Sequence, residues 1–198
     1  TKIVYCGVNI PKFKKIKKKK NILFVGKLNE SKGYKIFVEA AKKFKSINNE
    51  WNFIAVGNES RKVIFPNKDI VKEIGYKSNK YVLNLYKNSE ISVGNSVWNE
   101  PLGRIAIESS SRKCLPIISN IAGLKESKSI AYVLKYNNST ELFNVLIKFT
   151  KNITKRRKLQ NEYYNNNKFS IQSTAKKIDN IRTNIFKNIY HVNKSDKI

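Results

Sequence analysis

Short apolar runs that end at or just after a glycine recur along this chain, and they restrict its possible folds more than any other feature. The clearest run is Asn21–Leu28 (NILFVGKL), and similar runs occupy Trp51–Gly57, Ile70–Tyr76 and Ile91–Gly94. Continuous apolar segments of this length are typical of parallel strands that are buried on both faces. Because parallel strands are joined by crossovers that are usually helical, the pattern predicts an α/β fold.

Helical patterns lie between and after these runs. Residues that recur at three- and four-residue intervals follow Gly33: Ile36, Phe37, Ala40, Ala41 and Phe44. The segment Asn79–Asn88 has the spacing of a short helix, and a strand is expected over Leu115–Ser119. Beyond Ser139 the pattern is helical, interrupted by a polar basic stretch, and a last amphipathic helix is predicted over Ile171–Ile189.

The segment from residue 97 to residue 126 places two carboxylates around a turn. Glu100 and Glu108 lie eight positions apart, and a helix is predicted to begin near Gly103. The residues that form the turn are Pro101, Leu102 and Gly103. A helix that starts beside a glycine turn offers free N–H groups and the positive end of its dipole, which suit a phosphate. The segment is therefore a candidate anion site, and the alternative is a plain turn with two solvated glutamates.

Two motifs in this segment resemble a known enzyme family. The sequence N-E-P-L-G-R-I-A-I-E resembles the E-x7-E segment of the retaining glycosyltransferases of family 4, in the C-terminal half of the GT-B fold, and I-A-G-L-K-E resembles that family's G-G-x-x-E. The resemblance implies that Glu108 holds the ribose of a nucleotide-sugar and that Glu100 lies near the donor sugar. It extends in order from Gly7 to Phe169.

The same resemblance implies the overall architecture. The family has a Rossmann-like parallel sheet with helices on both faces, and F-S-I-Q-S-T-A-K-K-I is similar to its closing C-terminal helix, which packs back against the fold. We therefore expect residues 1–198 to form a single Rossmann-like domain that binds a nucleotide-sugar, with 190–198 as a mobile tail.

Further residues acquire roles by the same resemblance. The family's G-R-L and E-K-G correspond here to G-K-L-N-E-S-K-G, so Lys27 and Lys32 are expected to hold the donor diphosphate. Lysine at position 27 lacks the planar fork of arginine and gives weaker geometric control. A loop that touches the base in the family places Gly75 and Tyr76 near the nucleotide, although we favour Tyr76 as a packing aromatic. The expected catalytic residues are Lys27, Lys32 and Glu100, and the expected substrate-binding residues are Gly75, Tyr76, Pro101, Leu102, Gly103 and Glu108.

The chain departs from the family pattern after Glu108. Lys113 stands where a helix-ending glycine is usual, and Ala122 replaces the first of two glycines. The methyl group of Ala122 is expected to narrow the space for the donor sugar, if the backbone there permits alanine.

The charge balance suggests an anionic partner but argues against nucleic acid. The chain has 40 basic and 14 acidic residues, a formal net charge of +26, and 34 of the basic residues are lysine. Nucleic-acid readers rely on arginine, and no RNP-type run or Cys/His finger is present. The basic run Lys12–Lys20 is expected to be a solvated linker or, alternatively, a patch that faces anionic lipid. With one His and no cluster of Asp or Cys at ligand spacing, we expect no protein-held metal.

The sequence also bears on the expected location of the protein and on an expected N-terminal domain. No run approaches the length of a transmembrane helix, and no signal-peptide order is present, so a cytoplasmic location is expected, with peripheral contact at the inner face of the membrane left open. The chain starts at Thr1 and contains no Met, and I-V-Y-C-G-V-N-I is predicted to form a strand and resembles the start of the family's C-terminal domain. We therefore expect an N-terminal acceptor domain to be absent and the isolated chain to be inactive.

These expectations combine into one function with two alternatives. The resemblance implies transfer of a sugar from a nucleotide-diphosphate sugar to a glycan or lipid-linked acceptor, as in cell-surface polysaccharide synthesis, with retention at the anomeric carbon and without a cofactor or metal. The first alternative is a non-catalytic or split nucleotide-sugar-binding module that is inactive without a partner domain. The second is a basic nucleic-acid or lipid-surface protein in which the glutamates are incidental.

Overall fold

The computed structural model describes residues 2–13, 17–59, 69–166 and 168–195. Two compact units make up the chain: one is Pro11–Asn166, and the other combines Thr1–Ile10 with Asn167–Ile198. All six strands and the helices α1 to α5 belong to the first and larger unit, whereas α6 (Ile171–Ser195) belongs to the second. The formation of one domain by residues 1–198 stays a prediction.

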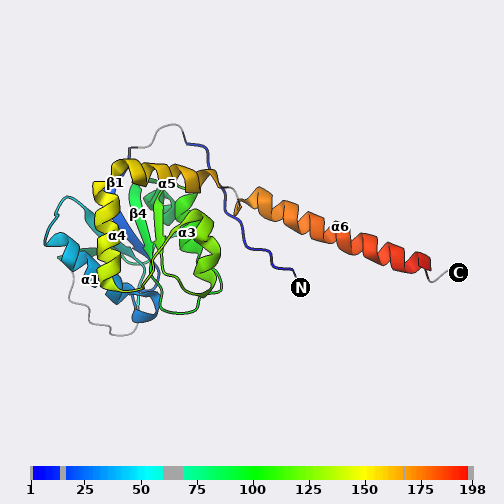
Figure 1. Ribbon diagram of the computed structural model, residues 1–198, viewed down its shortest axis with the longest axis horizontal. Coiled ribbons are helices and arrows are strands. Elements are labelled where there is room, and N and C mark those ends of the chain that lie inside the picture. The colour runs from blue at the N-terminus through cyan, green and yellow to red at the C-terminus, as the bar shows by residue number, and fades with distance from the viewer. Residues whose placement is uncertain (1, 14–16, 60–68, 167, 196–198) are drawn as a thin grey trace. The chain divides into compact units, whose positions relative to one another are not determined.

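The larger unit is built on a six-stranded parallel sheet with the strand order β3-β2-β1-β4-β5-β6. The strands are β1 (Lys19–Val25), β2 (Asn52–Val56), β3 (Val71–Glu73), β4 (Ser89–Gly94), β5 (Leu115–Ile118) and β6 (Tyr132–Val133). The central strands β1 and β4 lie side by side, with Ile22 opposite Ile91 (Figure 1). The chain reverses its direction of strand addition between these two strands, so their carboxyl ends form the switch point of the sheet.

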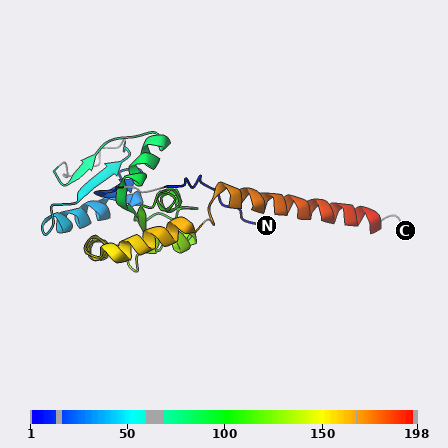
Figure 2. The ribbon, with the colours of Figure 1, turned by 90° about the horizontal axis from the view of Figure 1, so that it is seen from above.

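Helices cover both faces of this sheet, which confirms the predicted Rossmann-like α/β class. On one face α1 (Tyr34–Lys45) packs against α4 (Ser139–Lys151), and on the other α2 (Asn79–Lys87) packs against α3 (Arg104–Ser110) (Figure 2). The residues predicted to face inward from α1 are buried at Phe37, Ala40, Ala41 and Phe44. The 3-10 helices η1 (Glu30–Lys32) and η2 (Ala122–Ile130) lie in the connections after β1 and β5.

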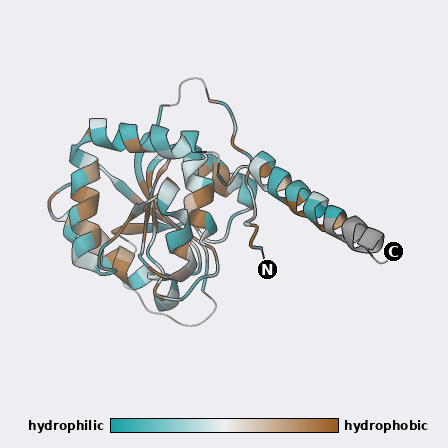
Figure 3. Ribbon diagram, turned by 45° about the vertical axis from the view of Figure 1, so that its right-hand side comes forward, coloured by the Kyte–Doolittle hydropathy of each residue, from teal (hydrophilic) through white to brown (hydrophobic). Residues whose placement is uncertain are grey.

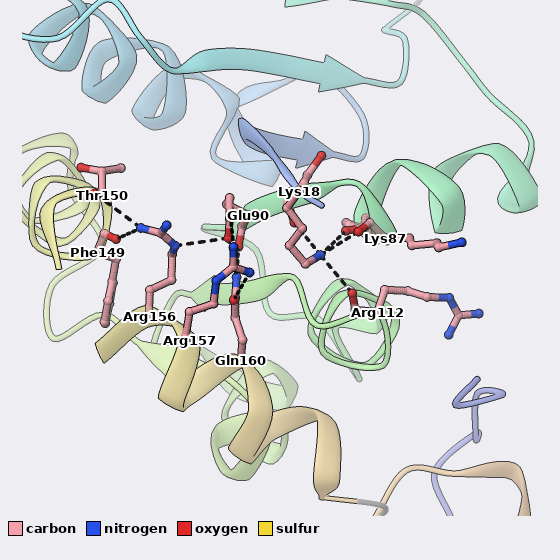
Figure 4. A network of polar contacts seen from close by, with 11 residues as sticks. Lys18, Lys87, Glu90, Arg112, Phe149, Thr150, Arg156, Arg157 and Gln160 are labelled. Carbon is pink, nitrogen blue, oxygen red and sulfur yellow. Dashed lines mark hydrogen bonds and ion pairs between the residues drawn. The ribbon is translucent and has the colours of Figure 1, made fainter. Parts of the chain in front are cut away.

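The polar basic stretch after α4, for which the sequence predicts no element, forms helix α5 (Ile153–Asn165). Figure 3 shows it as a largely hydrophilic helix at the top of the larger unit. Its inward side is nevertheless anchored, because Glu90 near the start of β4 accepts hydrogen bonds from Arg156 Nε at 3.2 Å, Arg157 Nη2 at 2.8 Å and Gln160 Nε2 at 3.0 Å (Figure 4). Charge-assisted bonds to one buried carboxylate therefore hold α5 against the sheet.

The basic run Lys12–Lys20 does not behave as a solvated linker throughout. The Lys18 ammonium donates to four backbone carbonyls at 2.7–3.3 Å, those of Tyr86, Lys87, Ser89 and Arg112 (Figure 4). Burial lowers the pKa of Lys18. Because this side chain joins the ends of α2 and α3 to the start of the sheet, both the linker and the lipid-facing interpretations are wrong for Lys18. Residues 14–16 lie outside the described residues.

In the smaller unit, Val8 pairs with Ser170 in an isolated parallel bridge. Residues 3–10 form no other bridge and no strand, so the predicted strand there is wrong. The predicted final helix is present as α6, whereas the mobility of 190–198 stays a prediction, and 196–198 lie outside the described residues. Within the described ranges, no helix combines the length and the apolar character needed to cross a bilayer.

Candidate functional site

A cavity of about 220 Å³ lies where β1 and β4 end, at the switch point of the sheet. Its lining residues come from the ends of both strands, from η1 and η2, from α2 and α3, and from the loops between them. Polar and charged side chains in this wall belong to Lys32, Tyr86, Ser96, Glu100, Arg104 and Glu108. Open parallel α/β sheets bind their ligands at this position, so the cavity is the candidate functional site.

The four charged side chains of the cavity form two ion pairs. Lys32 Nζ lies 3.0 Å from Glu100 Oε1, and Arg104 Nη2 lies 2.9 Å from Glu108 Oε1. The Glu108 side chain is 10% exposed and that of Glu100 19%, so both carboxylates are largely withdrawn from solvent. The structure thus brings together three predicted residues and adds Arg104, which the sequence analysis missed. Its spacing of four residues from Glu108 on one helix is the signal that could have identified it.

Backbone contacts hold the loop that carries Glu100. The Trp98 N–H donates to Ser31 O at 3.1 Å, and the Gly123 N–H donates to Glu100 O at 2.9 Å. A Cβ at Gly123 would lie 1.9 Å from Pro101 O, so the close approach of η2 to this loop requires glycine. The loop is therefore fixed between η1 and η2.

Helix α2 contributes two residues beside Glu108. Asn79 Nδ2 donates to Glu108 Oε1 at 3.3 Å, the same oxygen that meets Arg104, and within the described chain Oε2 makes no hydrogen bond. Tyr86 is fully buried and lines the same cavity. Burial raises the pKa of its hydroxyl well above the ordinary value, and the Glu108 carboxylate and Cys114 thiol raise it further. Tyr86 therefore remains protonated at neutral pH.

The predicted helix start at the turn is confirmed, since α3 begins at Arg104 with Gly103 as its N-cap. Pro101 is exposed, Leu102 half-buried and Gly103 buried, and none of the three is among the described residues that line the cavity. With seven residues, α3 has a smaller dipole than a longer helix. Anion binding by the N–H groups of this turn stays a prediction.

Three other predicted site residues lie outside the cavity wall. Lys27 is exposed and directly follows Gly26, which does line the cavity. Gly75 adopts a φ of 68°, and its neighbour Tyr76 is 75% exposed. The interpretation of Tyr76 as a packing aromatic is therefore wrong, whereas contact of this turn with a base stays a prediction.

Two departures from the family pattern retain the backbone that glycine would adopt. Lys113 has a φ of 55° and Ala122 a φ of 33°, both in the left-handed region. Ala122 is exposed and does not belong to the described lining of the cavity, and a narrowing of the donor-sugar space by its methyl group stays a prediction. The substitutions change the side chain while the local path of the chain is kept.

The arrangement can bind a ligand that carries both an anion and hydroxyl groups. Lys32 and Arg104 are donors that suit phosphate oxygens, and Glu100 and Glu108 accept hydrogen bonds from hydroxyl groups. Across the described ranges, no group of three or more His, Cys, Asp and Glu side chains is placed to hold a metal ion.

Comparison with known proteins identifies the family. Residues 8–167 match the model of the family described as Glycosyl transferases group 1. No curated protein matches the chain. Similar solved structures include the sucrose-phosphate synthase of Thermosynechococcus elongatus, with a TM-score of 0.75 and 17% identity over 94% of this chain and 53% of that one. HepE (Alr3699) of Anabaena in complex with UDP has a TM-score of 0.70 and 16% identity over 84% and 49% of the two chains.

A glycosyltransferase of Rickettsia africae is also similar, with a TM-score of 0.70 and 25% identity over 88% of this chain and 49% of that one. The chain thus spans about half the length of these solved structures. Its parallel sheet with helices on both faces and a final helix is the fold of the C-terminal domains of GT-B glycosyltransferases. The matched range contains every residue of the cavity wall, and the chain belongs to the Glycosyl transferases group 1 family.

Proposed function

We propose that this domain binds a nucleotide-diphosphate sugar and forms the donor-binding part of a retaining glycosyltransferase of family 4, which transfers a hexose to a glycan or lipid-linked acceptor of the cell surface. The observation that carries the proposal is the pairing of two cations with two carboxylates in one cavity at the switch point. Family membership supports the reaction class, and HepE was solved with UDP and with UDP-glucose.

Each ion pair contains one group for the phosphates and one for the sugars. Lys32 and Arg104 exchange their carboxylate partners for the diphosphate oxygens, and Lys27 adds charge from the exposed turn after β1. Glu108 then accepts hydrogen bonds from the ribose, and Glu100 orients the donor sugar. Before a ligand binds, the pairs neutralise the two largely buried carboxylates, which lowers the cost of withdrawing them from solvent.

The same cations serve the chemical step. When the bond between the anomeric carbon and the diphosphate breaks, negative charge develops on the departing phosphate oxygens, and Lys32 and Arg104 stabilise it without a metal ion. A second candidate function is a nucleotide-sugar-binding module that transfers nothing without a partner domain.

Calorimetric titration of the folded chain with UDP, GDP, ADP, TDP and their sugars tests the proposal. We expect one nucleoside diphosphate to bind, with an affinity that EDTA does not change. Glu108→Ala should weaken nucleotide and nucleotide-sugar alike by about 1.5–3 kcal/mol, whereas Glu100→Ala should affect only the sugar-bearing ligand. A folded sample that binds none of the panel would overturn the proposal, and transfer to an acceptor by this chain alone would exclude the second candidate.

We also propose a cytoplasmic location with peripheral contact to an anionic membrane surface, which the net charge of +26 supports. Vesicles of phosphatidylglycerol should co-sediment the protein at low salt, whereas vesicles of phosphatidylcholine should not. Equal recovery on both kinds of vesicle would contradict an electrostatic contact.

A further inference from the structure

One residue of the cavity wall, Tyr86, carries a hydroxyl whose hydrogen-bonding capacity the described protein does not use. Tyr86 is 0% exposed, and its buried Oη has no hydrogen-bond partner among the described residues. An unsatisfied buried polar group costs about 1–3 kcal/mol, and native proteins contain few of them. An unpaired hydroxyl on a residue that lines a candidate ligand cavity suggests a hydrogen-bond partner on the ligand.

The surroundings of Tyr86 leave few other roles for its hydroxyl. The side chain belongs to an apolar cluster whose buried members are Leu23, Val56, Val82, Tyr86 and Cys114. A phenylalanine would fill this cluster equally well, and it would not bury an unpaired oxygen. Packing therefore does not explain why this position carries a hydroxyl group.

The neighbouring helix supplies a complementary atom. Glu108 on α3 lines the same cavity as Tyr86 on α2, and the two helices pack against each other. Glu108 Oε1 is occupied by Asn79 and Arg104, whereas Oε2 forms no hydrogen bond in the described chain. The cavity is thus lined by a tyrosine whose hydroxyl is unpaired and by a glutamate of which one carboxylate oxygen, Oε2, makes no hydrogen bond in the described chain.

We propose that the Tyr86 hydroxyl donates a hydrogen bond to a ribose hydroxyl of the bound nucleotide, beside the Glu108 carboxylate. This inference rests on the proposed function. A vicinal diol offers two donors and two acceptors, so a carboxylate alone satisfies its hydrogens and leaves its oxygens unpaired. Tyr86 supplies the missing donor, and the raised pKa of its hydroxyl keeps it protonated. A site of this kind rejects a ligand without the hydroxyl, because its own buried group is then left unpaired.

Tyr86→Phe tests the inference with UDP, 2′-deoxy-UDP and 3′-deoxy-UDP as calorimetric probes. We expect the variant to bind UDP about tenfold more weakly, the equivalent of one hydrogen bond of ~1.4 kcal/mol. The deoxy analogue that lacks the contacted hydroxyl should bind wild type and variant equally. The melting temperature of Tyr86→Phe should stay the same or rise, since an unpaired buried oxygen is removed.

Tyr34→Phe is a matched control. Tyr34 is equally buried, lies outside the cavity wall, and donates to Glu73 Oε1 at 2.5 Å. Its loss should lower the melting temperature by about 2–4 °C and leave the UDP affinity unchanged. Unchanged UDP binding by Tyr86→Phe, or equal losses for all three probes, would overturn the inference while wild-type binding still supports the proposed function. A wild type that binds no nucleoside diphosphate would overturn both.

Discussion

Lys32 and Lys27 lie close in sequence but differ in their relation to the cavity. Lys32 lines it and is paired with Glu100, whereas Lys27 is exposed. Lys32→Ala should weaken UDP binding by about 1.5–3 kcal/mol, because a charge-assisted contact is lost, and should leave uridine binding nearly unchanged. Lys27→Ala should cost less than about 1 kcal/mol, since solvent screens its charge. Titration calorimetry with UDP and uridine measures both effects.

The control for these variants is Lys35→Ala on the exposed side of α1, which should bind UDP like the wild type. Equal losses for UDP and uridine in Lys32→Ala would indicate misfolding. A larger loss in Lys27→Ala than in Lys32→Ala would contradict the arrangement of the cavity.

Ala122 and Gly123 are adjacent residues: the first is an alanine in a backbone conformation that favours glycine, and the second is a glycine that has no space for a side chain. Ala122 is exposed at a φ of 33°, a left-handed conformation that costs a non-glycine residue about 1–2 kcal/mol. Ala122→Gly removes this cost. Glycine also raises the conformational entropy of the unfolded chain, which lowers stability by about 0.4–1 kcal/mol, so a net stabilisation of about 0.5–1 kcal/mol is expected. Gly123→Ala should destabilise by about 1–3 kcal/mol, since its Cβ would overlap Pro101 O.

Urea unfolding followed by circular dichroism checks both variants. Gly123→Ala should also weaken nucleotide-sugar binding, because the Gly123 N–H holds the Glu100 carbonyl. A stable Gly123→Ala with unchanged sugar binding would show that η2 does not position Glu100.

The sequence motifs identify three of the four charged residues in the described cavity wall and leave out the fourth, Arg104. Glu100, Glu108 and Lys32 belong to short motifs with fixed spacing, and the structure places all three in one cavity. Tyr86 was assigned only to an apolar helix pattern, because periodicity places a side chain on a face without showing whether its hydroxyl is paired. The motif fixes the positions of the two glutamates, whereas the pairing of Arg104 with Glu108 depends on helix spacing, which the motif does not encode.

At the scale of elements, α5 depends on one carboxylate. Glu90 and Arg156 are each 4% exposed, and Arg156 also donates to Phe149 O and Thr150 O. Glu90→Ala leaves the Arg156 guanidinium without its counter-charge, so a loss of about 3–5 kcal/mol in unfolding free energy is expected. Chemical denaturation measures it, and Glu50→Ala, which breaks the exposed pair with Lys20, should cost far less, since solvent screens that pair.

Because Glu90 lies near the start of β4 and the cavity lies at its other end, UDP affinity at a temperature where Glu90→Ala is folded should be unchanged. Similar stability losses in the Glu90 and Glu50 variants would show that the buried network does not anchor α5.

The same helix shows where sequence patterns stop being informative. Strands and helices that bury apolar side chains, such as β1 and α1, were predicted within a few residues of their observed bounds. Helix α5 buries Arg156, Gln160 and Tyr163 instead, so it has no apolar periodicity to detect. The burial of Lys18 could not be predicted for a related reason. Its carbonyl partners are remote in sequence, and nothing in a run of lysines indicates which one is buried.

For the whole molecule, the excess of positive charge is a destabilising field as well as an attraction for anions. Even if each of the 14 acidic residues neutralised one of the 40 basic residues, 26 positive charges would remain uncompensated. Like charges on a compact surface repel one another, and unfolding relieves the repulsion by separating them. Added salt screens this repulsion in the folded state, and it equally screens the attraction of the site for a diphosphate.

The melting temperature should therefore rise as sodium chloride increases from 0.01 M, while UDP affinity falls over the same range. Most of the rise should occur below about 0.15 M, because the Debye length shrinks from about 30 Å to about 8 Å in that interval. Differential scanning calorimetry measures the first effect and isothermal titration the second. A salt effect on hydrophobic burial would instead keep increasing at molar salt, so the shape of the curve separates the two causes. A melting temperature that is flat or falls below 0.15 M would show that charge repulsion does not limit the stability of this fold.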